Sequence, residues 1–452
     1  MDTKQLREAL TARGITKVKV GGFDVDGVLR GKYVALDKFW SIVEEGFGFC
    51  DVIFGWDCGD VLYDNAKVTG WATGYPDTKA RVDVSSFRVL PWEPNTAAFL
   101  VDFFASDGSS HPACPRSLLK KVIARASSLG YSAKFSAEFE FYIFKETPES
   151  LHAKRFRDLT PLSPGMFGYS WLREGQNSDL CHAILDEMGS FEIPIEALHT
   201  ETGPGVYEVA LRYDDALRMA DNAALFKTSL KQLCMRFGVC PTFMAKFSHD
   251  LPGSSGHLHQ SLWGGEPKHN LFHDEGDANK LSALAKNYLG GQVALMPELT
   301  ALYSPTINSY KRYVPGVWAP LTASWGFENR TCAIRAIPGG PSATRLEYRQ
   351  TAADINPYIA IATALAAGLH GIENKTEPPP PAQGDASRRD GKFAALPRTL
   401  RDASRWLAKS VAAKEILGEG FVDHYVRTRD WEVRQFDRVV TEWELRRYFE
   451  VI

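Results

Sequence analysis

Residues 131–144, "YSAKFSAEFEFYIF", decide the fold class because two kinds of side chain alternate along the whole stretch. A period of two predicts a β-strand with one polar and one apolar face. The polar face carries Lys134, Ser136, Glu138 and Glu140, and the apolar face carries Phe135, Ala137, Phe139 and Phe141. Glutamates in place of the usual Thr, Ser and Lys indicate a face that presents functional groups.

Four further segments place chemically active residue types on predicted strands in the same way. In "HTETGPGVYEVALRY" (199–213), a GPG turn separates Glu201 from a strand whose polar face holds Glu208 and Arg212. The other aligned sets are His257, His259 and Ser261 in "SGHLHQSLW" (255–263), Arg335 in "CAIRAI" (332–337), and Arg345, Glu347 and Arg349 in "TRLEYRQ" (344–350).

These strand faces have two interpretations. Each strand alone fits the solvated face of an antiparallel sheet, and a single His-x-His is more often structural than a ligand. Together, several acids and a histidine favour an oxygen-rich site for Mg²⁺ or Mn²⁺, and interleaved arginines suit phosphate or carboxylate. The combination predicts metal-assisted phosphoryl transfer from a nucleotide. The chain has no Walker A motif and no GxGxxG after a strand, so neither a P-loop nor a Rossmann site is expected.

The composition excludes several classes of function. The chain has 452 residues, of which 44% are hydrophobic and 24% charged, and a net charge of −3, so no nucleic-acid partner is expected. No stretch is long and apolar enough to span a membrane, and "MDTKQLREALTARG" at the N-terminus predicts a polar helix rather than a signal peptide. Seven cysteines without a CxxC pair predict reduced thiols in a cytoplasmic protein.

The order of predicted elements indicates two domains. "VKVGGFDVDGVLRGKYVAL" (18–36) predicts a hairpin that turns at Asp26–Gly27, and a helix start at Pro115 opens a new unit, so we place the boundary between residues 109 and 110. Strands do not alternate regularly with helices, which predicts an α+β rather than a doubly wound fold. Long helices are expected at 278–303, 357–374, 398–417 and 428–452, with an exposed proline-rich loop at 377–391.

At these residues the chain resembles the glutamine synthetase family along nearly its whole length. The blocks that carry the resemblance are "AEFEF", "ETGPGVYE", "PGSSGHLHQSL", "NSYKRYVPG", "ENRTCAIR" and "TRLEYRQTAADINPY", in the order and spacing of the family. "DVDGVLRGKYV" (24–34) and "LPWEPNTAAFLVDFFASDG" (90–108) resemble the family's β-grasp domain and its exit. The resemblance implies a small β-grasp domain (1–109) and a catalytic domain (110–452) whose curved antiparallel half-barrel sheet is backed by helices.

The resemblance also implies the site, position by position. One metal ion would be held by Glu140, Glu201 and Glu208, a second by Glu138, His257 and Glu347, giving two or three Mg²⁺ or Mn²⁺ ions per site. Arg330, Arg335 and Arg345 match arginines around the transferred phosphate, and His259 and Ser261 fall on the ATP wall. Gly253, Arg312 and Arg349 match residues that grip L-glutamate. Family members form ring-shaped homo-oligomers, often dodecamers, in which a neighbour's N-terminal domain completes each site.

Departures from the family pattern concern the ammonium site. The family loop normally carries a glutamate at the position of Trp318, where it helps to deprotonate and shield ammonium. Pro252 replaces an asparagine beside the glutamate site, and Val206 replaces the glutamine of the usual GPGQ turn. The N-terminal aspartate that helps to bind ammonium has three candidates, Asp51, Asp57 and Asp60. We therefore expect an amine pocket made by Trp318 with Asp51 or Asp57, and Asp51, Arg312, Arg330 and Arg335 are the expected catalytic residues.

Three functions follow in order of preference. The first is a γ-glutamyl-amide ligase, which joins glutamate to an organic amine through γ-glutamyl phosphate and releases ADP and phosphate. The second is ordinary glutamine synthesis from ammonia. The third is a non-catalytic regulator or structural ring that keeps the fold, and the six intact metal-ligand positions argue against it.

Overall fold

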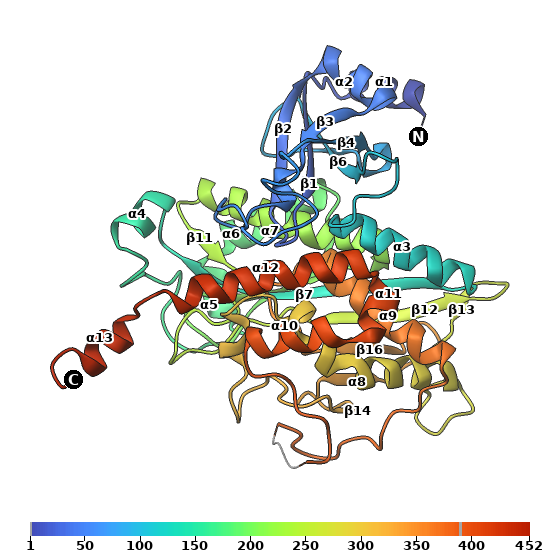
Figure 1. Cartoon of the computed structure of the whole chain (residues 1–452), viewed down its shortest axis with the longest axis vertical. Coiled ribbons are helices and arrows are strands. Elements are labelled where there is room, and N and C mark those ends of the chain that lie inside the picture. The colour runs from blue at the N-terminus through green and yellow to red at the C-terminus, as the bar shows by residue number, and fades with distance from the viewer. Residues whose placement is uncertain (1, 388–390) are drawn as a thin grey trace.

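The computed structural model describes residues 2–387 and 391–452 and has two sheets of different construction (Figure 1). The smaller, N-terminal sheet has six strands in the order β2-β1-β6-β4-β3, with β5 paired to β6. Their bounds are β1 Lys17–Phe23, β2 Leu29–Ala35, β3 Phe47–Cys50, β4 Asp77–Val82, β5 Arg88–Val89 and β6 Thr96–Phe104. β1 and β2 form the predicted hairpin around residues 24–28, and helices α1 (Thr3–Ala12) and α2 (Leu36–Glu45) accompany this β-grasp sheet.

The larger sheet has ten strands and forms the curved half-barrel that the sequence predicts. Its central path runs β14-β15-β16-β12-β7-β9-β8, and every pair is antiparallel except β14 with β15. The bounds are β7 Ser132–Phe144, β8 Ile195–Thr200, β9 Val206–Leu211, β10 Asp214–Asp215, β11 Cys240–Thr242, β12 Leu258–Gly264, β13 His269–Asn270, β14 Trp325–Phe327, β15 Ile334–Ile337 and β16 Arg345–Tyr348. The α+β class is confirmed.

β7 is the centre of this sheet and shows why its sequence alternates. Its apolar residues are buried and its polar residues half-buried along Ser132–Glu140, and Phe139 and Phe141 pack against Phe226 of α7 (Ala216–Arg236) with ring centroids 6.3 and 6.2 Å apart. The apolar face therefore joins the helical layer. Glu138 and Glu140 lie on the opposite face of the sheet, which does not pack against this helical layer and can form a functional site.

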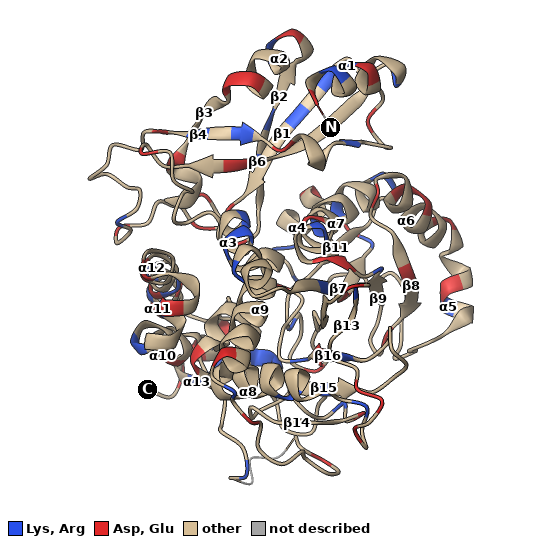
Figure 2. Ribbon diagram, turned by 90° about the vertical axis from the view of Figure 1, so that its right-hand side faces the viewer, with Lys and Arg blue, Asp and Glu red and all other residues tan. Residues whose placement is uncertain are grey.

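Helices cover the apolar side of the sheet, as Figure 2 shows from the side. The longer ones are α3 Pro115–Ser128, α6 Ser178–Ser190, α7 Ala216–Arg236, α8 Ala283–Tyr303, α9 Pro357–Glu373, α10 Leu400–Lys409 and α12 Glu419–Asp437. The short ones are α4 Pro148–Ala153, α5 Trp171–Gln176, α11 Val411–Leu417, α13 Glu442–Tyr448 and the 3₁₀ turns η1 Asp51–Phe54, η2 Val84–Ser86 and η3 Ser309–Arg312.

Two predicted helices are wrong in extent. The helix expected at 398–417 is two helices, because Ser410 ends α10 and its hydroxyl accepts the backbone N–H of Ala413 at the start of α11. The helix expected at 428–452 is likewise divided, since Thr441 caps a separate α13 with a capping box to Glu444. Of the predicted proline-rich loop, residues 388–390 lie outside the described residues, and Ala382 in its first half donates to the carbonyl of Trp325.

The β1–β2 turn of the N-terminal sheet contacts the start of α9. Asn356 caps that helix by accepting the N–H of Tyr358, and its side-chain amide donates to the carbonyls of Asp24 and Val25 in the β1–β2 turn. Arg429 of α12 is also buried here and pairs with Asp26. Among the described helices, none is long and apolar enough to cross a bilayer.

Candidate active site

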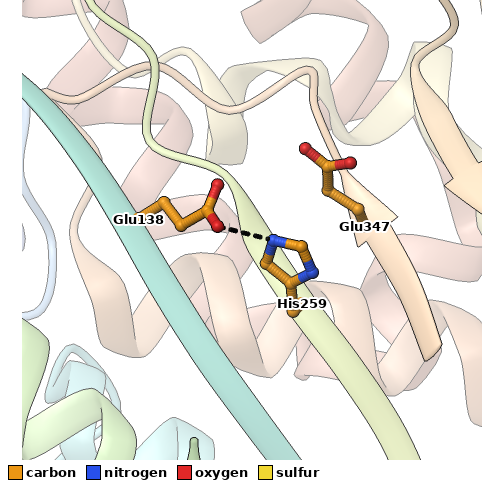
Figure 3. Close-up of side chains that lie close together, drawn as sticks. All are labelled: Glu138, His259 and Glu347. Carbon is orange, nitrogen blue, oxygen red and sulfur yellow. Dashed lines mark ion pairs between the residues drawn. The ribbon is translucent and has the colours of Figure 1, made fainter. Parts of the chain in front are cut away.

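Strand register brings together the predicted metal ligands Glu138, His257 and Glu347, with His259 beside them; they form the first metal group of the structure. His259 on β12 lies opposite Glu347 on β16 and opposite Ser136 on β7, and Glu138 donates its backbone N–H to the carbonyl of His257. Nδ1 of His257 is 3.5 Å from a carboxylate oxygen of Glu138 and 3.5 Å from one of Glu347. Nε2 of His259 is 3.1 Å from the other oxygen of Glu138, the ion pair drawn in Figure 3.

The two histidines of this group have different surroundings. Nε of Arg345 donates to Nδ1 of His259 at 3.1 Å, so the proton of His259 is on Nε2, which lies 3.1 Å from Glu138. Nδ1 of His257 has no such donor. The buried Nε2 atoms of His257 and His259 both lack a hydrogen-bond partner among the described residues. Burial, helped by the charge of Arg349, lowers the pKa of His257 to about 4, so its ring is neutral at pH 7, as ligation of a metal requires.

Both carboxylates of this group stay ionised. Burial alone would raise the pKa of Glu347, but electrostatic interactions with the His257 ring, the Arg349 guanidinium and the His259 ring outweigh it and lower that pKa to about 2. Burial opposes ionisation of Glu138 as well, and hydrogen bonds from His257 and His259 overcome it and lower its pKa. Two anionic oxygens, each 3.5 Å from Nδ1 of a neutral imidazole, fit a divalent cation.

The second group lies on the neighbouring strands β8 and β9. Glu208 faces Glu140 of β7 on one side and His199 of β8 on the other. Ligand atoms of His199, Glu201 and Glu208 lie within 4.8 Å of one another. Burial, followed by the charges of Glu140 and other carboxylates, raises the pKa of Glu208 to about 9. A cation bound here would relieve this repulsion, so these residues also fit the metal that the resemblance implies.

His199 is a residue that the sequence analysis missed. It stands two positions before Glu201 in "HTE", the spacing that puts two side chains on one strand face, and the same rule had drawn attention to His257 and His259. Glu140 faces the group from β7, and one of its oxygens accepts the backbone N–H of Ser255 at 2.7 Å.

The predicted site arginines differ in their hydrogen-bond and ion-pair partners. Arg335 pairs with Glu328 and donates to Glu347 at 3.1 Å, and Arg349 contacts Glu347 and donates to the carbonyl of Arg330 at 3.1 Å. Arg312 is buried, and its guanidinium donates to the Ser255 hydroxyl at 2.9 Å and to the Gln350 carbonyl at 3.0 Å. The side chain of Arg330 is exposed.

Two cavities flank the metal-ligand groups. The larger, of about 780 Å³, is lined by Glu140, Glu201, Gly253, Arg312 and Trp318. The smaller, of about 340 Å³, is lined by Glu138, His259, Ser261 and Arg345. Gly253 and Arg312, predicted for glutamate, line the larger cavity, and His259, Ser261 and Arg345, predicted for ATP, line the smaller one. Three predicted arginines line neither cavity: Arg349 lies beside Glu347, Arg335 pairs with Glu328 and Glu347, and Arg330 lines a separate cavity near Trp318. Pro252 and Val206 line the larger cavity as well.

None of the three candidate aspartates lines either cavity of its own chain. Asp51 is buried and accepts the hydroxyl of Thr69 at 2.7 Å. Asp57 accepts the indole N–H of Trp431 at 3.0 Å, and Asp60 pairs with Arg30 at 2.6 Å. Within one chain, the site is made by the catalytic domain alone.

Comparison with known proteins agrees with this geometry. The model of the glutamine synthetase catalytic domain matches residues 112–448. The chain belongs to the glutamine synthetase family. It is therefore a ligase that forms C–N bonds, and the family uses ATP and a divalent metal.

Relatives within the glutamine synthetase family carry different names. A type-1 glutamine synthetase 2 of Dictyostelium discoideum is 50% identical over 96% of this chain and 84% of its own. A glutamate–isopropylamine ligase of a Pseudomonas species is 38% identical over 99% and 98% of the two chains, and a γ-glutamylethanolamide synthetase of Streptomyces coelicolor is 37% identical over 100% and 96%. A solved GmaS/ADP complex superposes with a TM-score of 0.86 at 29% identity, covering 98% and 99% of the chains.

Proposed function

We propose that the protein joins the γ-carboxylate of L-glutamate to an organic amine in an ATP-dependent reaction. The proposal rests on the position of Trp318, which is 66% exposed and lines the larger cavity. The loop from 313 to 320 contains no acid, whereas the family pattern places a glutamate at this position. A carboxylate stabilises the binding of a small cation. The binding of an organic group is instead stabilised by burial of apolar surface, at about 25 cal/mol per Å² buried.

The reaction would use both cavities, with glutamate in the larger one and ATP in the smaller one. In the first step, an oxygen of the γ-carboxylate bonds to the terminal phosphorus of ATP, the bond to the bridging oxygen breaks, and ADP leaves. Arg330, Arg335 and Arg345 would stabilise the transferred phosphate, and divalent cations held by the two carboxylate groups would neutralise its oxygens. In the second step, the neutral amine nitrogen bonds to the γ-carbonyl carbon, the bond from that carbon to the phosphate oxygen breaks, phosphate leaves, and the nitrogen releases one proton to solvent or to a base.

Glutamate would be held by Arg312 and Gly253 in the larger cavity. Arg349, which lies beside Glu347, would also bind it. The guanidinium of Arg312 is fixed by the Ser255 hydroxyl and the Gln350 carbonyl, so it loses little conformational freedom on binding a carboxylate. Gly253 has no side chain to fill the cavity, and an added Cβ there would lie 2.7 Å from the carbonyl oxygen of Ala245.

The walls of the cavity favour one class of amine. Around Trp318 the lining includes Val314, Val317 and Met166, all partly exposed apolar side chains. We rank apolar or aromatic monoamines above polyamines, because an indole offers a distal ammonium only a cation–π contact. Both rank above ammonia. An alkylammonium, with a pKa near 10.4, still needs a base, whereas an arylamine is already neutral at pH 7.

Glutamine synthesis is the second candidate, because the relative with 50% identity is named a glutamine synthetase. The two candidates are separated by the variant Trp318→Glu. If Trp318 is the wall of an amine pocket, this variant loses activity with an organic amine and gains activity with ammonium. Trp406→Glu, on the outer helix α10, is the matched control and should change neither activity. Loss of both activities in proportion would contradict the role given to Trp318.

We also propose that sites are shared in a ring of identical subunits, a dodecamer as the family resemblance implies, because none of the candidate aspartates lines the two cavities of its own chain. Mixing inactive Asp51→Asn and Glu347→Gln subunits under dissociating conditions should then restore part of the activity on reassembly. A mixed interface would combine two intact parts when the Asp51→Asn subunit supplies the catalytic domain and the Glu347→Gln subunit supplies the N-terminal domain. No recovery, with light scattering showing mixed rings, would refute sharing through Asp51.

A further inference from the structure

His199 occupies a position that suits a metal ligand. It lies on β8 directly opposite Glu208 on β9, and it precedes Glu201 by two residues. Its Nε2 is 3.8 Å from an oxygen of Glu208, and one ligand atom from each of His199, Glu201 and Glu208 lies within 4.8 Å of the others. A cation seated between the two carboxylates would therefore be within reach of the imidazole.

The ring of His199 is oriented for ligation. Its Nδ1 is 3.2 Å from the carbonyl oxygen of Thr200, so Nδ1 carries the proton and donates it there. Nε2 then has its lone pair directed toward Glu208. Metal-binding histidines commonly donate their second ring N–H to a carbonyl or carboxylate in this way, which fixes both the tautomer and the ring plane.

Tyr169 stacks on one face of the His199 ring. The two rings are stacked, with centroids 4.4 Å apart and planes 20° from parallel. Tyr169 adopts a left-handed backbone conformation, with φ of 53°, that non-glycine residues rarely adopt. Its backbone N–H donates to the carbonyl of Thr200 at 2.7 Å, and the next N–H, of Ser170, donates to the Thr200 hydroxyl at 2.8 Å. One residue, Thr200, thus anchors both the imidazole and the ring that covers it, and strained conformations held in this way are typical of functional sites.

We propose that His199 is a ligand of the ion held by Glu201 and Glu208, in addition to Glu140, and that Tyr169 is the residue that positions its ring. The site would then have a mixed nitrogen and oxygen donor set. Imidazole favours Mn²⁺ over Mg²⁺ relative to an all-oxygen site, so His199 would set the metal preference of this position. The inference concerns the metal and does not depend on which amine the enzyme uses.

Binding of Mn²⁺ without nucleotide, glutamate or amine tests the inference, with free Mn²⁺ measured by electron paramagnetic resonance during a titration of the full-length protein. The key variant is His199→Phe, which keeps an aromatic ring against Tyr169 and removes the nitrogen. We expect one class of Mn²⁺ site to weaken at least about ten-fold and the other to be unchanged. His182→Phe, an exposed histidine on α6, is the matched control and should bind Mn²⁺ like the wild type.

Tyr169 is tested in the same titration. Tyr169→Gly relieves the backbone and removes the ring, so the same class of site should weaken, by less than in His199→Phe. Tyr169→Phe keeps the stacked ring and should bind Mn²⁺ normally. If Tyr169→Gly and Tyr169→Phe bind alike, the positioning role of Tyr169 is wrong.

A spectroscopic measurement keeps the inference testable if His199→Phe weakens both classes of site through misfolding. Mn²⁺ bound to the double variant His257→Asn/His259→Asn, which lacks both imidazoles beside Glu138 and Glu347, should still show electron spin-echo modulation from a ligating nitrogen, and adding His199→Phe should abolish it. Absence of nitrogen modulation in the double variant, or Mn²⁺ affinities of His199→Phe equal to those of the wild type, would overturn the assignment. Neither result would bear on the choice between an organic amine and ammonia.

Discussion

Glu347 is the side chain on which the charges of the first metal group converge. It is 1% exposed, it contacts Arg349, it accepts from Arg335 at 3.1 Å, and His257 lies 3.5 Å away. A buried carboxylate with two arginine partners is stabilised as an anion, and removing its charge leaves those partners unbalanced. The chemistry at this residue therefore depends on charge and not only on shape.

The isosteric variant Glu347→Gln tests that dependence. We expect turnover to fall by at least about 100-fold, because the variant keeps the volume but loses an anion beside the nucleotide phosphates. The Mg²⁺ concentration needed for half-maximal rate should also rise. Glu373→Gln, which removes a surface pair with Arg125, should have little effect on either quantity. Near-normal turnover of Glu347→Gln at ordinary Mg²⁺ would show that Glu347 is not a metal ligand.

At the scale of elements, the contact between α8 and α9 shows how the layer behind the sheet is packed. Gly291 of α8 lies so close to α9 that an added Cβ would be 2.3 Å from the carbonyl oxygen of Ala367 and 2.5 Å from Cα of Gly371. A Cβ on Gly368 would likewise lie 2.1 Å from the ring of Tyr288. Glycine is therefore required at Gly291 by the close approach of the α9 backbone and at Gly368 by the ring of Tyr288.

The variant Gly291→Ala should consequently lower the thermal unfolding temperature. Overpacking of this kind typically costs about 1–3 kcal/mol, since the neighbouring atom is backbone and cannot move aside. Gly189→Ala on α6 is the matched control, because nothing lies within 4 Å of its added Cβ and alanine is the better helix former. If both variants unfold at the wild-type temperature, the close approach of α8 and α9 is not as described.

The same elements show what a sequence can and cannot predict. The polar and apolar alternation of residues 131–144 predicted β7 and the face that carries Glu138 and Glu140, because a strand has a fixed period of two. The break at Ser410 was missed, since a serine that ends one helix and starts the next leaves the helical pattern of 398–417 intact. His199 was missed although its two-residue spacing from Glu201 was a local signal, because its contact with Glu208 depends on the pairing of β8 with β9. The separation of Arg349 from the cavity lining also depends on tertiary contacts that no local pattern encodes.

At the scale of the whole molecule, two buried histidines lie where the N-terminal domain meets the helices. His424 of α12 is 0% exposed, and His111 is 6% exposed and stacks on Phe54 of the N-terminal domain with centroids 4.5 Å apart. Burial lowers the pKa of His111 to about 4, and burial together with the charge of His111 lowers the pKa of His424 to about 3. Both rings are therefore neutral in the folded protein at pH 7.

These pKa values predict the direction of acid sensitivity. In the unfolded chain a histidine binds a proton near pH 6.5, whereas in the folded chain these two bind it only near pH 4 and pH 3. Stability is thus fully present above about pH 6.5 and is lost as the pH falls toward 4. Between pH 7 and pH 4.5, the unfolding temperature of His424→Phe should fall less than that of the wild type. The unfolding temperature of the control His182→Phe, at an exposed histidine, should fall as much as that of the wild type. Parallel curves for all three proteins would contradict the role of His424.

The most direct test of the central claim measures the wild-type enzyme with a panel of amines. ADP release is followed at fixed glutamate, ATP and Mg²⁺ with ammonium, a branched alkylamine, an amino alcohol, a diamine and an aniline, and the products are identified by mass spectrometry. The proposal predicts a γ-glutamylamide of an organic monoamine, formed with a kcat/KM above that for ammonium, and no ADP release without glutamate. A kcat/KM for ammonium higher than for every organic amine, with glutamine as the product, would contradict it.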